Sequence, residues 1–157
     1  MHNEMKVDPT MLSFDIAQRI AHTVLEEGRR RGTAPLTVAV LDAGGHQVVL
    51  YRQDGAGIVR PQIAVGKAWG SLGLGFSSRG IAEAAKRFPG FFDALAVASD
   101  GRMFPAPGGV LLRDGSGVIV GAVGVSGDSS DVDEACAVIA AREAGLVPEP
   151  AVPTASA

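Results

Sequence analysis

Residues 108–127 read GGVLLRDGSGVIVGAVGVSG, and this stretch decides the fold. Two runs of aliphatic and β-branched residues, 110–113 and 118–125, flank the turn-forming residues 114–117. Such an arrangement predicts two strands joined as a β-hairpin. Glycine supplies 21 of the 157 residues, whereas aromatic residues make up only 5%. We therefore expect tight turns and close approaches between backbones, rather than bulky core layers, to shape the molecule.

A second hairpin is expected upstream, from runs 36–41 and 47–51 around the turn residues 42–45. A short strand near residues 102–104 would precede the first hairpin. With helices between the hairpins and at both ends, this order favours an α+β fold, an antiparallel sheet with packed helices, over a parallel βαβ fold.

Four helices are expected around these strands. The first follows Ser13, has the 3.6-residue apolar period and ends at Gly32. The second opens at Pro61 and should be short, because glycines at 70, 73 and 75 disfavour helix. The third runs over 79–87 with Ser78 as its cap, ends at Pro89-Gly90 and leads into a connection that is either mobile or pocket-lining. The last begins in 128–131 and ends at Ala144.

Length and composition predict one domain, residues 12–147, between a flexible N-terminal tail, 1–11, and a disordered C-terminal tail, 148–157. The net charge of -3 and the scattered basic residues argue against nucleic-acid binding. Apolar runs are far too short for a transmembrane helix. The N-terminus lacks a secretory pattern, which favours a cytoplasmic protein. A single cysteine, Cys136, without histidines at ligand spacing, predicts no metal cluster.

Several polar residues are candidates for a ligand site. Lys67 lies among small neighbours, so its amine either pairs with a ligand carboxylate or propionate or extends to solvent. Arg60 and Arg79 bracket the same stretch and have the same two readings. His22 and His46 lie in predicted ordered segments, and each is either an axial haem ligand or a solvated side chain.

Acidic residues at the start of the last helix are a further candidate. Asp133 and Glu134 are stabilised there by the helix dipole. Alternatively, one of them faces a pocket and holds a cation or a substrate amine.

Three stretches together resemble the GlcG/HbpS-like, or haem-degrading domain, family. They are Val38–His46 with Arg52–Gly55, Ile63–Ala68, and Gly108-Gly109 continuing through Gly121–Gly127 to Ala135. The resemblance implies a five-stranded antiparallel sheet with packed helices, a profilin- or PAS-like two- or three-layer sandwich, and assembly into dimers, tetramers or octamers. It also implies haem binding in some members. The site residues it points to are Asp42, Gly44, Gly45, His46, Lys67, Gly108, Gly109, Asp133 and Glu134. The sequence departs from the family's pattern at Pro105-Ala106-Pro107.

The leading interpretation is a homo-oligomeric small-ligand-binding protein with haem as the candidate ligand. The alternative is a cofactor-independent enzyme that acts on a small organic substrate by proton transfer or carbon-carbon bond rearrangement. Lys67 would then be the electrophilic or Schiff-base group and Asp133 or Glu134 the base. A third possibility is an assembly protein without catalysis.

Overall fold

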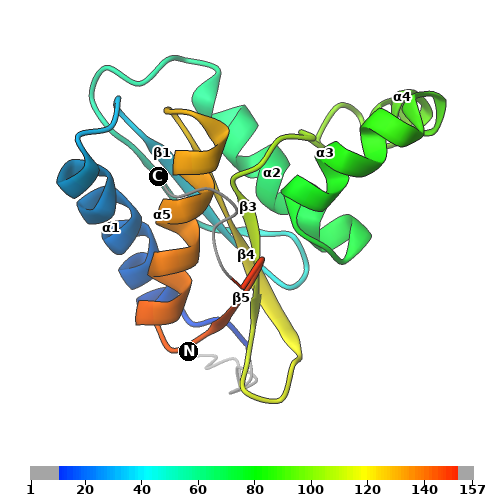
Figure 1. The fold of residues 1–157 in the computed structure, drawn as a ribbon. Helices are drawn as coiled ribbons and strands as arrows, with labels where there is room; N and C mark the ends of the chain where they lie inside the picture. Colours follow the sequence, from blue (N-terminus) through cyan, green and yellow to red (C-terminus); the bar gives the residue numbers. More distant parts are fainter. Residues whose placement is uncertain (1–10, 152–157) are drawn as a thin grey trace, which may run out of the picture.

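Figure 1 shows the computed structural model, which describes residues 11–151. Its centre is a five-stranded antiparallel sheet in the order β2-β1-β4-β3-β5. The expected α+β class and five-stranded antiparallel sheet are confirmed. The strands are β1 Thr37–Asp42, β2 Gln47–Arg52, β3 Gly109–Arg113, β4 Ile119–Ser126 and β5 Val147–Glu149. The helices are α1 Phe14–Arg31, α2 Arg60–Leu74, α3 Ser78–Arg87, α4 Pro89–Ala98 and α5 Ser130–Glu143.

Helices cover both faces of the sheet, which makes a three-layer sandwich. Because side chains alternate along a strand, Val38 and Val40 of β1 face α1 and α5, while Leu41 faces α2. The first face carries the larger apolar cluster, with Ile20 and Val24 of α1 fully buried. Burial of such side chains, at roughly 1.5–3 kcal/mol each, holds the α1–α5 layer against the sheet.

Local signals at the ends of α1 and α5 are confirmed. The Ser13 hydroxyl accepts a hydrogen bond from the Ile16 amide, and Gly32 ends α1 in the left-handed conformation, at φ 68°. Ser129, within the expected capping region, accepts from the Val132 amide and starts α5. The cap of α3 lies one residue earlier than expected, at Ser77.

The second face of the sheet is built differently, by direct contact between backbones. A Cβ atom added at Gly109 of β3 would overlap the carbonyl oxygen of Lys67, and one at Gly124 of β4 would overlap that of Ala64. Helix α2 thus lies on two glycines, with Ala68 and Leu41 filling the small apolar cluster beside them. The close approaches expected from the glycine content occur here.

The expectation of a short second helix is wrong, because α2 has 15 residues and continues through Gly70 and Gly73. Tertiary packing overrides propensity at Gly70, where an added Cβ would lie 2.6 Å from Met103 Cγ. The helix ends at Gly75 with a φ of 79°.

Three other local expectations are corrected. Pro89-Gly90 opens α4 instead of a loop, because proline is well placed in a first helical turn. Residues 102–104 form no strand, and the Phe104 amide instead donates to the carbonyl of Gly66. The fifth strand is β5, which pairs with β3, so Pro148 and Glu149 belong to the sheet and not to the expected C-terminal tail. Residues 1–10 and 152–157, in the two expected tails, lie outside the described residues.

No helix within residues 11–151 is long and apolar enough to cross a membrane.

Substitution Gly124→Ala tests the contact between α2 and β4. We expect it to lower the free energy of unfolding by about 3 kcal/mol, because the added methyl group must push α2 away from the sheet. Urea unfolding followed by circular dichroism measures the change. Gly115→Ala, in the hairpin turn, is the control: its Cβ would have no neighbour within 4 Å, so the expected change stays within about 0.5 kcal/mol. Equal losses in the two variants would contradict the role assigned to Gly124.

Candidate functional site

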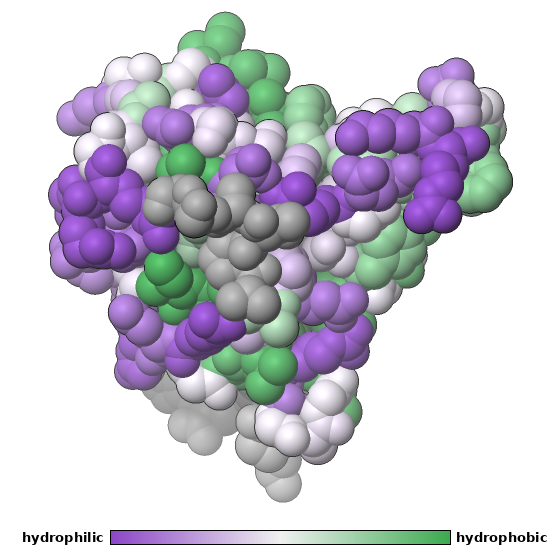
Figure 2. All heavy atoms as spheres, viewed as in Figure 1, coloured by the Kyte–Doolittle hydropathy of each residue, from purple (hydrophilic) through white to green (hydrophobic). Residues whose placement is uncertain are grey.

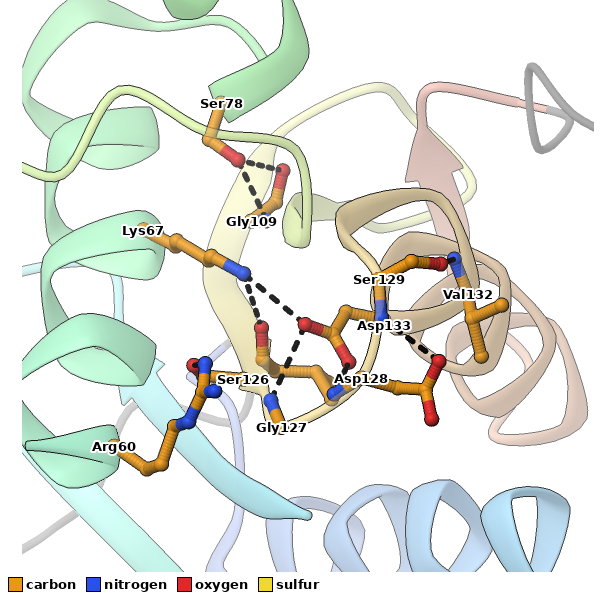
Figure 3. Close-up of polar contacts among 11 residues, drawn as sticks. Arg60, Lys67, Ser78, Gly109, Ser126, Gly127, Asp128, Ser129, Val132 and Asp133 are labelled. Carbon is orange, nitrogen blue, oxygen red and sulfur yellow. Dashed lines mark hydrogen bonds and ion pairs between the residues drawn. The ribbon is translucent and has the colours of Figure 1, made fainter. Parts of the chain in front are cut away.

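The polar centre of the structure is a buried pair between Lys67 of α2 and Asp133 of α5 (Figure 3). Lys67 Nζ donates to the carbonyl oxygen of Val125 at 2.8 Å and lies 3.3 Å from Asp133 Oδ2. The two residues are only 2% and 1% exposed. The structure therefore brings together two residues that the sequence singled out separately.

Asp133 has further partners in the turn that precedes α5. Its carboxylate accepts hydrogen bonds from the backbone amides of Gly127, at 3.3 Å, and Asp128, at 3.0 Å. Ser129 caps the helix, so Asp133 lies in the first turn and its side chain reaches back to these amides. The carboxylate thus fixes the turn and neutralises Lys67 at the same time.

Burial dominates the electrostatics of this pair. Loss of solvent lowers the pKa of Lys67, against the attraction of Asp133. The same loss raises the pKa of Asp133, although Lys67 and the two amides oppose the change. Each charge is therefore costly to bury alone and depends on the other.

Arg79 and Glu134 form a second pair beside the first. Arg79 Nε lies 3.0 Å from Glu134 Oε2, and Arg79 Nη2 bonds Asp131. Glu134 is fully buried. The adjacent Ser78 hydroxyl accepts a hydrogen bond from the Gly109 amide at 2.6 Å. The Nε and Nη2 atoms of Arg79 thus bond to protein carboxylates.

The other residues predicted around Lys67 lie close to it, and the charge of Arg60 adds to the lowering of the Lys67 pKa. Arg60, in the first turn of α2, donates from Nη1 to the Ser126 hydroxyl at 3.1 Å. An added Cβ at Gly108 would lie 2.8 Å from Lys67 Nζ, and one at Gly109 would overlap the Lys67 carbonyl. These glycines make room for Lys67 and for the backbone of α2.

His46 belongs to a separate place, the β1–β2 turn. Asp42 Oδ1 accepts from the amides of Gly44, at 2.9 Å, and His46, at 3.0 Å, and lies 3.3 Å from His46 Nδ1. Gly45, with a φ of 82°, closes the turn. The His46 side chain is 82% exposed.

A pocket of about 380 Å³ lies beside this turn. Apart from Asp42 and His46, its lining is apolar or small: Met11, Leu12, Ala43, Gly44, Val118, Ile119 and Val120. Met11 and Val118 are among the large apolar residues that remain exposed. His46 could be identified from the sequence, but Met11 and Val118 could not, because they are distant from it in sequence and meet it only in the fold.

The second predicted histidine has different surroundings. His22 Nε2 lies 3.5 Å from Glu26 Oε1, one turn along α1. The hollow beside it is lined mostly by polar side chains, namely Asp15, Gln18, Arg19 and Tyr51.

The Lys67 cluster and the His46 turn lie at opposite ends of β1. Ser126, beside the cluster, pairs with Thr37 at the start of the strand, whereas the His46 turn follows Asp42 at its end. Five residue steps separate Thr37 from Asp42, or roughly 17 Å at the rise of a β-strand. Apart from His22, the predicted site residues thus form two groups and not one.

Within residues 11–151, no three His, Cys, Asp or Glu side chains gather in a way that could hold a metal ion. The thiol of Cys136 is buried, and burial raises its pKa to about 11.

Comparison with known protein families gives a match over most of the chain. The model of the HbpS-like family, described as haem degrading protein HbpS-like, matches residues 12–142. Among curated proteins, the corrinoid adenosyltransferase PduO of Salmonella typhimurium is 27% identical over 140 residues, which are 87% of this chain. The chain spans only 40% of the length of that relative.

Solved structures share the fold over most of their length. A complex of PduOC with haem superposes with a TM-score of 0.78 at 24% identity and covers 87% of this chain and 96% of the other. Protein ORFY of Klebsiella pneumoniae gives 0.75 at 26% identity, with 92% and 95% covered. A double mutant of HbpS from Streptomyces reticuli gives 0.74 at 24% identity, with 91% and 92% covered.

Substitution Lys67→Met tests the buried pair. We expect it to lower the free energy of unfolding by about 3–5 kcal/mol at neutral pH, because Asp133 would remain buried without its counter-charge. The pKa of Asp133 is already raised in the folded protein and would rise further in the variant. The loss should therefore be largest at high pH and shrink as falling pH protonates the lone carboxylate.

Urea unfolding at several pH values measures both effects. Lys86→Met is the matched control, because the Lys86–Glu83 pair is exposed, and its removal should change stability by less than about 1 kcal/mol. A loss in Lys67→Met that equals the control, or that does not depend on pH, would contradict this view of the pair.

Proposed function

The chain belongs to the HbpS-like family, and from that premise we propose that it is a homo-oligomeric protein that binds haem in the pocket beside His46. One observation carries the proposal. An exposed imidazole stands at the edge of a pocket whose other walls are mainly apolar. Haem needs such a combination, a side chain for the iron and an apolar slot for the macrocycle.

The residues present at His46 fit an axial ligand. With its Nδ1 atom directed to Asp42 Oδ1, the imidazole keeps Nε2 available for a metal. A carboxylate behind a ligating histidine fixes the tautomer and the orientation of the ring. The hydrogen bonds from Gly44 and His46 to the same oxygen hold Asp42 in place.

The pocket also has a suitable size and lining. Its volume of about 380 Å³ lies in the range of small-molecule sites, about 300–1,000 Å³. Leu12 and Val120 form buried parts of the wall, while Met11 and Val118 expose apolar surface that a macrocycle would cover. When bound there, haem would supply redox chemistry, and the protein would hold it and shield it from water.

His46 is a better candidate than His22. The polar lining beside His22 would leave a macrocycle in contact with charged groups such as Asp15 and Arg19. For Lys67 and Arg79, pairing with propionates was one of two readings of the sequence. Lys67 lies at the other end of β1, and the two residues bond Asp133 and Glu134. The proposal therefore gives them a structural role.

The enzyme alternative requires an accessible amine at Lys67. That residue is 2% exposed, and its Nζ atom is occupied by Val125 and Asp133. Glu134, one of the two candidate bases, is held by Arg79. These contacts favour ligand binding as the proposed function over Schiff-base chemistry.

Assembly of several copies is supported by α4. This helix is strongly apolar, yet it buries none of its residues. Phe91 is 61% exposed, and the neighbouring Phe88 is similarly open. Figure 2 shows the projecting arm of α3 and α4 at the right, with apolar surface at its tip and along its lower side. An apolar helix of this kind is typical of an interface, and we propose that other copies of the chain cover it.

Titration with haemin, followed by absorption spectroscopy, tests the site. We expect a saturable, sharpened Soret band that His46→Ala weakens in affinity by at least about tenfold, because the iron loses its axial imidazole. His22→Ala is the control and should bind as the parent protein does. A featureless additive spectrum would contradict haem binding, and loss of the band in His22→Ala alone would place the haem elsewhere.

Substitution Phe91→Ser tests the assembly. We expect a smaller mass in solution, measured by light scattering over a wide concentration range, because the apolar contact between copies is lost. Ile58→Ser removes an even more exposed apolar side chain outside α4 and should leave the mass unchanged. A parent protein that is monomeric at all concentrations would refute the proposal.

A further inference from the structure

A second pocket lies on the other side of the sheet from α1 and α5, between α2 and the end of α4. It has a volume of about 150 Å³. Trp69, Gly70, Gly73, Leu74, Leu95, Ala98, Ser99 and Met103 line it. No lining residue carries a charge. Met103, Ser99 and Gly70 are buried, whereas Gly73 and Ala98 are exposed, so the pocket runs from the surface into the interior.

Trp69 is held firmly at one wall of this pocket. Its Cδ1 and Nε1 atoms lie 3.3 Å from where a Cβ of Gly45 would stand, so this edge of the indole rests against the β1–β2 turn. The guanidinium of Arg102 lies over the indole, 5.5 Å from the ring centroid. The opposite edge, at Cζ3, is the part nearest to Gly73.

Gly73 keeps the pocket open. It lies in the last turns of α2 without a positive φ, so a larger residue would fit the backbone and favour the helix by up to about 1 kcal/mol. A Cβ at this position would have Trp69 Cζ3 as its nearest neighbour, at 4.0 Å. Gly70 is different, because Met103 fills the space beside it. Glycine at position 73 therefore lowers the stability of the helix, although no neighbouring atom excludes a larger side chain there.

We propose that this pocket binds a small, uncharged aromatic molecule of about one ring. A volume near 150 Å³ is about that of an apolar cavity that accepts benzene. The one hydroxyl in the wall, of Ser99, already donates to the carbonyl of Ala96. A charged ligand would therefore lose its hydration without gaining a partner.

The ligand would stack or meet edge-on with Trp69, while Leu74, Leu95 and Met103 supply adaptable apolar contacts. This inference is independent of haem. The pocket shares no lining residue with the one beside His46, and each can fail without the other.

Titration of the full chain with toluene tests the proposal. Trp69 is the only tryptophan in the sequence, so its fluorescence reports on the pocket directly. We expect a saturable change in that fluorescence and a higher thermal midpoint, because toluene binds only the folded state. Benzoate has the same ring with a carboxylate in place of the methyl group, and it should produce neither effect. Binding of benzoate as strong as that of toluene would overturn the assignment to an uncharged ligand.

Substitutions that fill the pocket test whether toluene binds there. Gly73→Leu and, from the opposite wall, Ala98→Leu should each weaken toluene binding by at least about tenfold, because the new side chains fill the pocket. Gly115→Leu, on the distant hairpin turn, is the matched control and should bind as the parent does. Two filling variants on different helices guard against a folding defect in one of them, which circular dichroism would reveal.

Other outcomes overturn the proposal. Toluene without effect on the parent protein would do so, as would equal loss of binding in Gly115→Leu. If toluene has no effect and Gly73→Leu changes the mass of the protein in solution, the pocket receives a second copy of the chain and not a small molecule.

Discussion

The contact on which the rest of the structure depends is that of α2 with the backbones of β3 and β4. Only glycine at 109 and 124 allows the carbonyls of Lys67 and Ala64 to come so close to the sheet. This contact fixes the height and rotation of the helix. Its rotation sends Lys67 toward α5 and places Trp69 against the β1–β2 turn. The buried ion pair and the apolar pocket beside α4 are therefore both consequences of two missing side chains.

The ion pairs then connect layers that the sheet keeps apart. Helix α2 covers one face and α5 the other, yet Lys67 meets Asp133 beyond the end of β4, and Arg79 meets Glu134 close by. Burial of these charges contributes little net stability, since desolvation offsets the attraction. The pairs instead disfavour other arrangements of the helices, because any arrangement that separates the partners leaves a buried charge without its counter-charge. The glycine contact and the ion pairs thus restrict the same helix in two ways, one steric and one electrostatic.

Elements that depend on local interactions could be predicted from the sequence. Ser13 and Gly32 bound α1 as expected, and both hairpins follow from their aliphatic and β-branched runs and the turn residues between them. Prediction fails where tertiary contacts decide: Gly70 looks like a helix breaker until Met103 is seen beside it, and β5 is too short to recognise without β3 as its neighbour. The same limit applies to the site. Lys67, Asp133 and His46 could each be identified from the sequence. It did not predict that Lys67 pairs with Asp133 or that His46 lies in a separate group of residues.

The residues that hold the helices in place differ from the residues that line the pockets. The motifs that carry the family resemblance around Lys67, Gly108-Gly109 and Asp133 build the contacts that hold α2 and α5, so the likeness transfers the fold. The pocket walls come from other positions, such as Met11 and Val118 beside His46, and Gly73 and Ala98 beside Trp69. A change at these positions would alter the shape of a pocket without disturbing the glycine contact or the ion pairs. Ligand choice can therefore differ between chains that share every structural motif. The residues of the pocket walls, more than the motifs, determine which ligand fits.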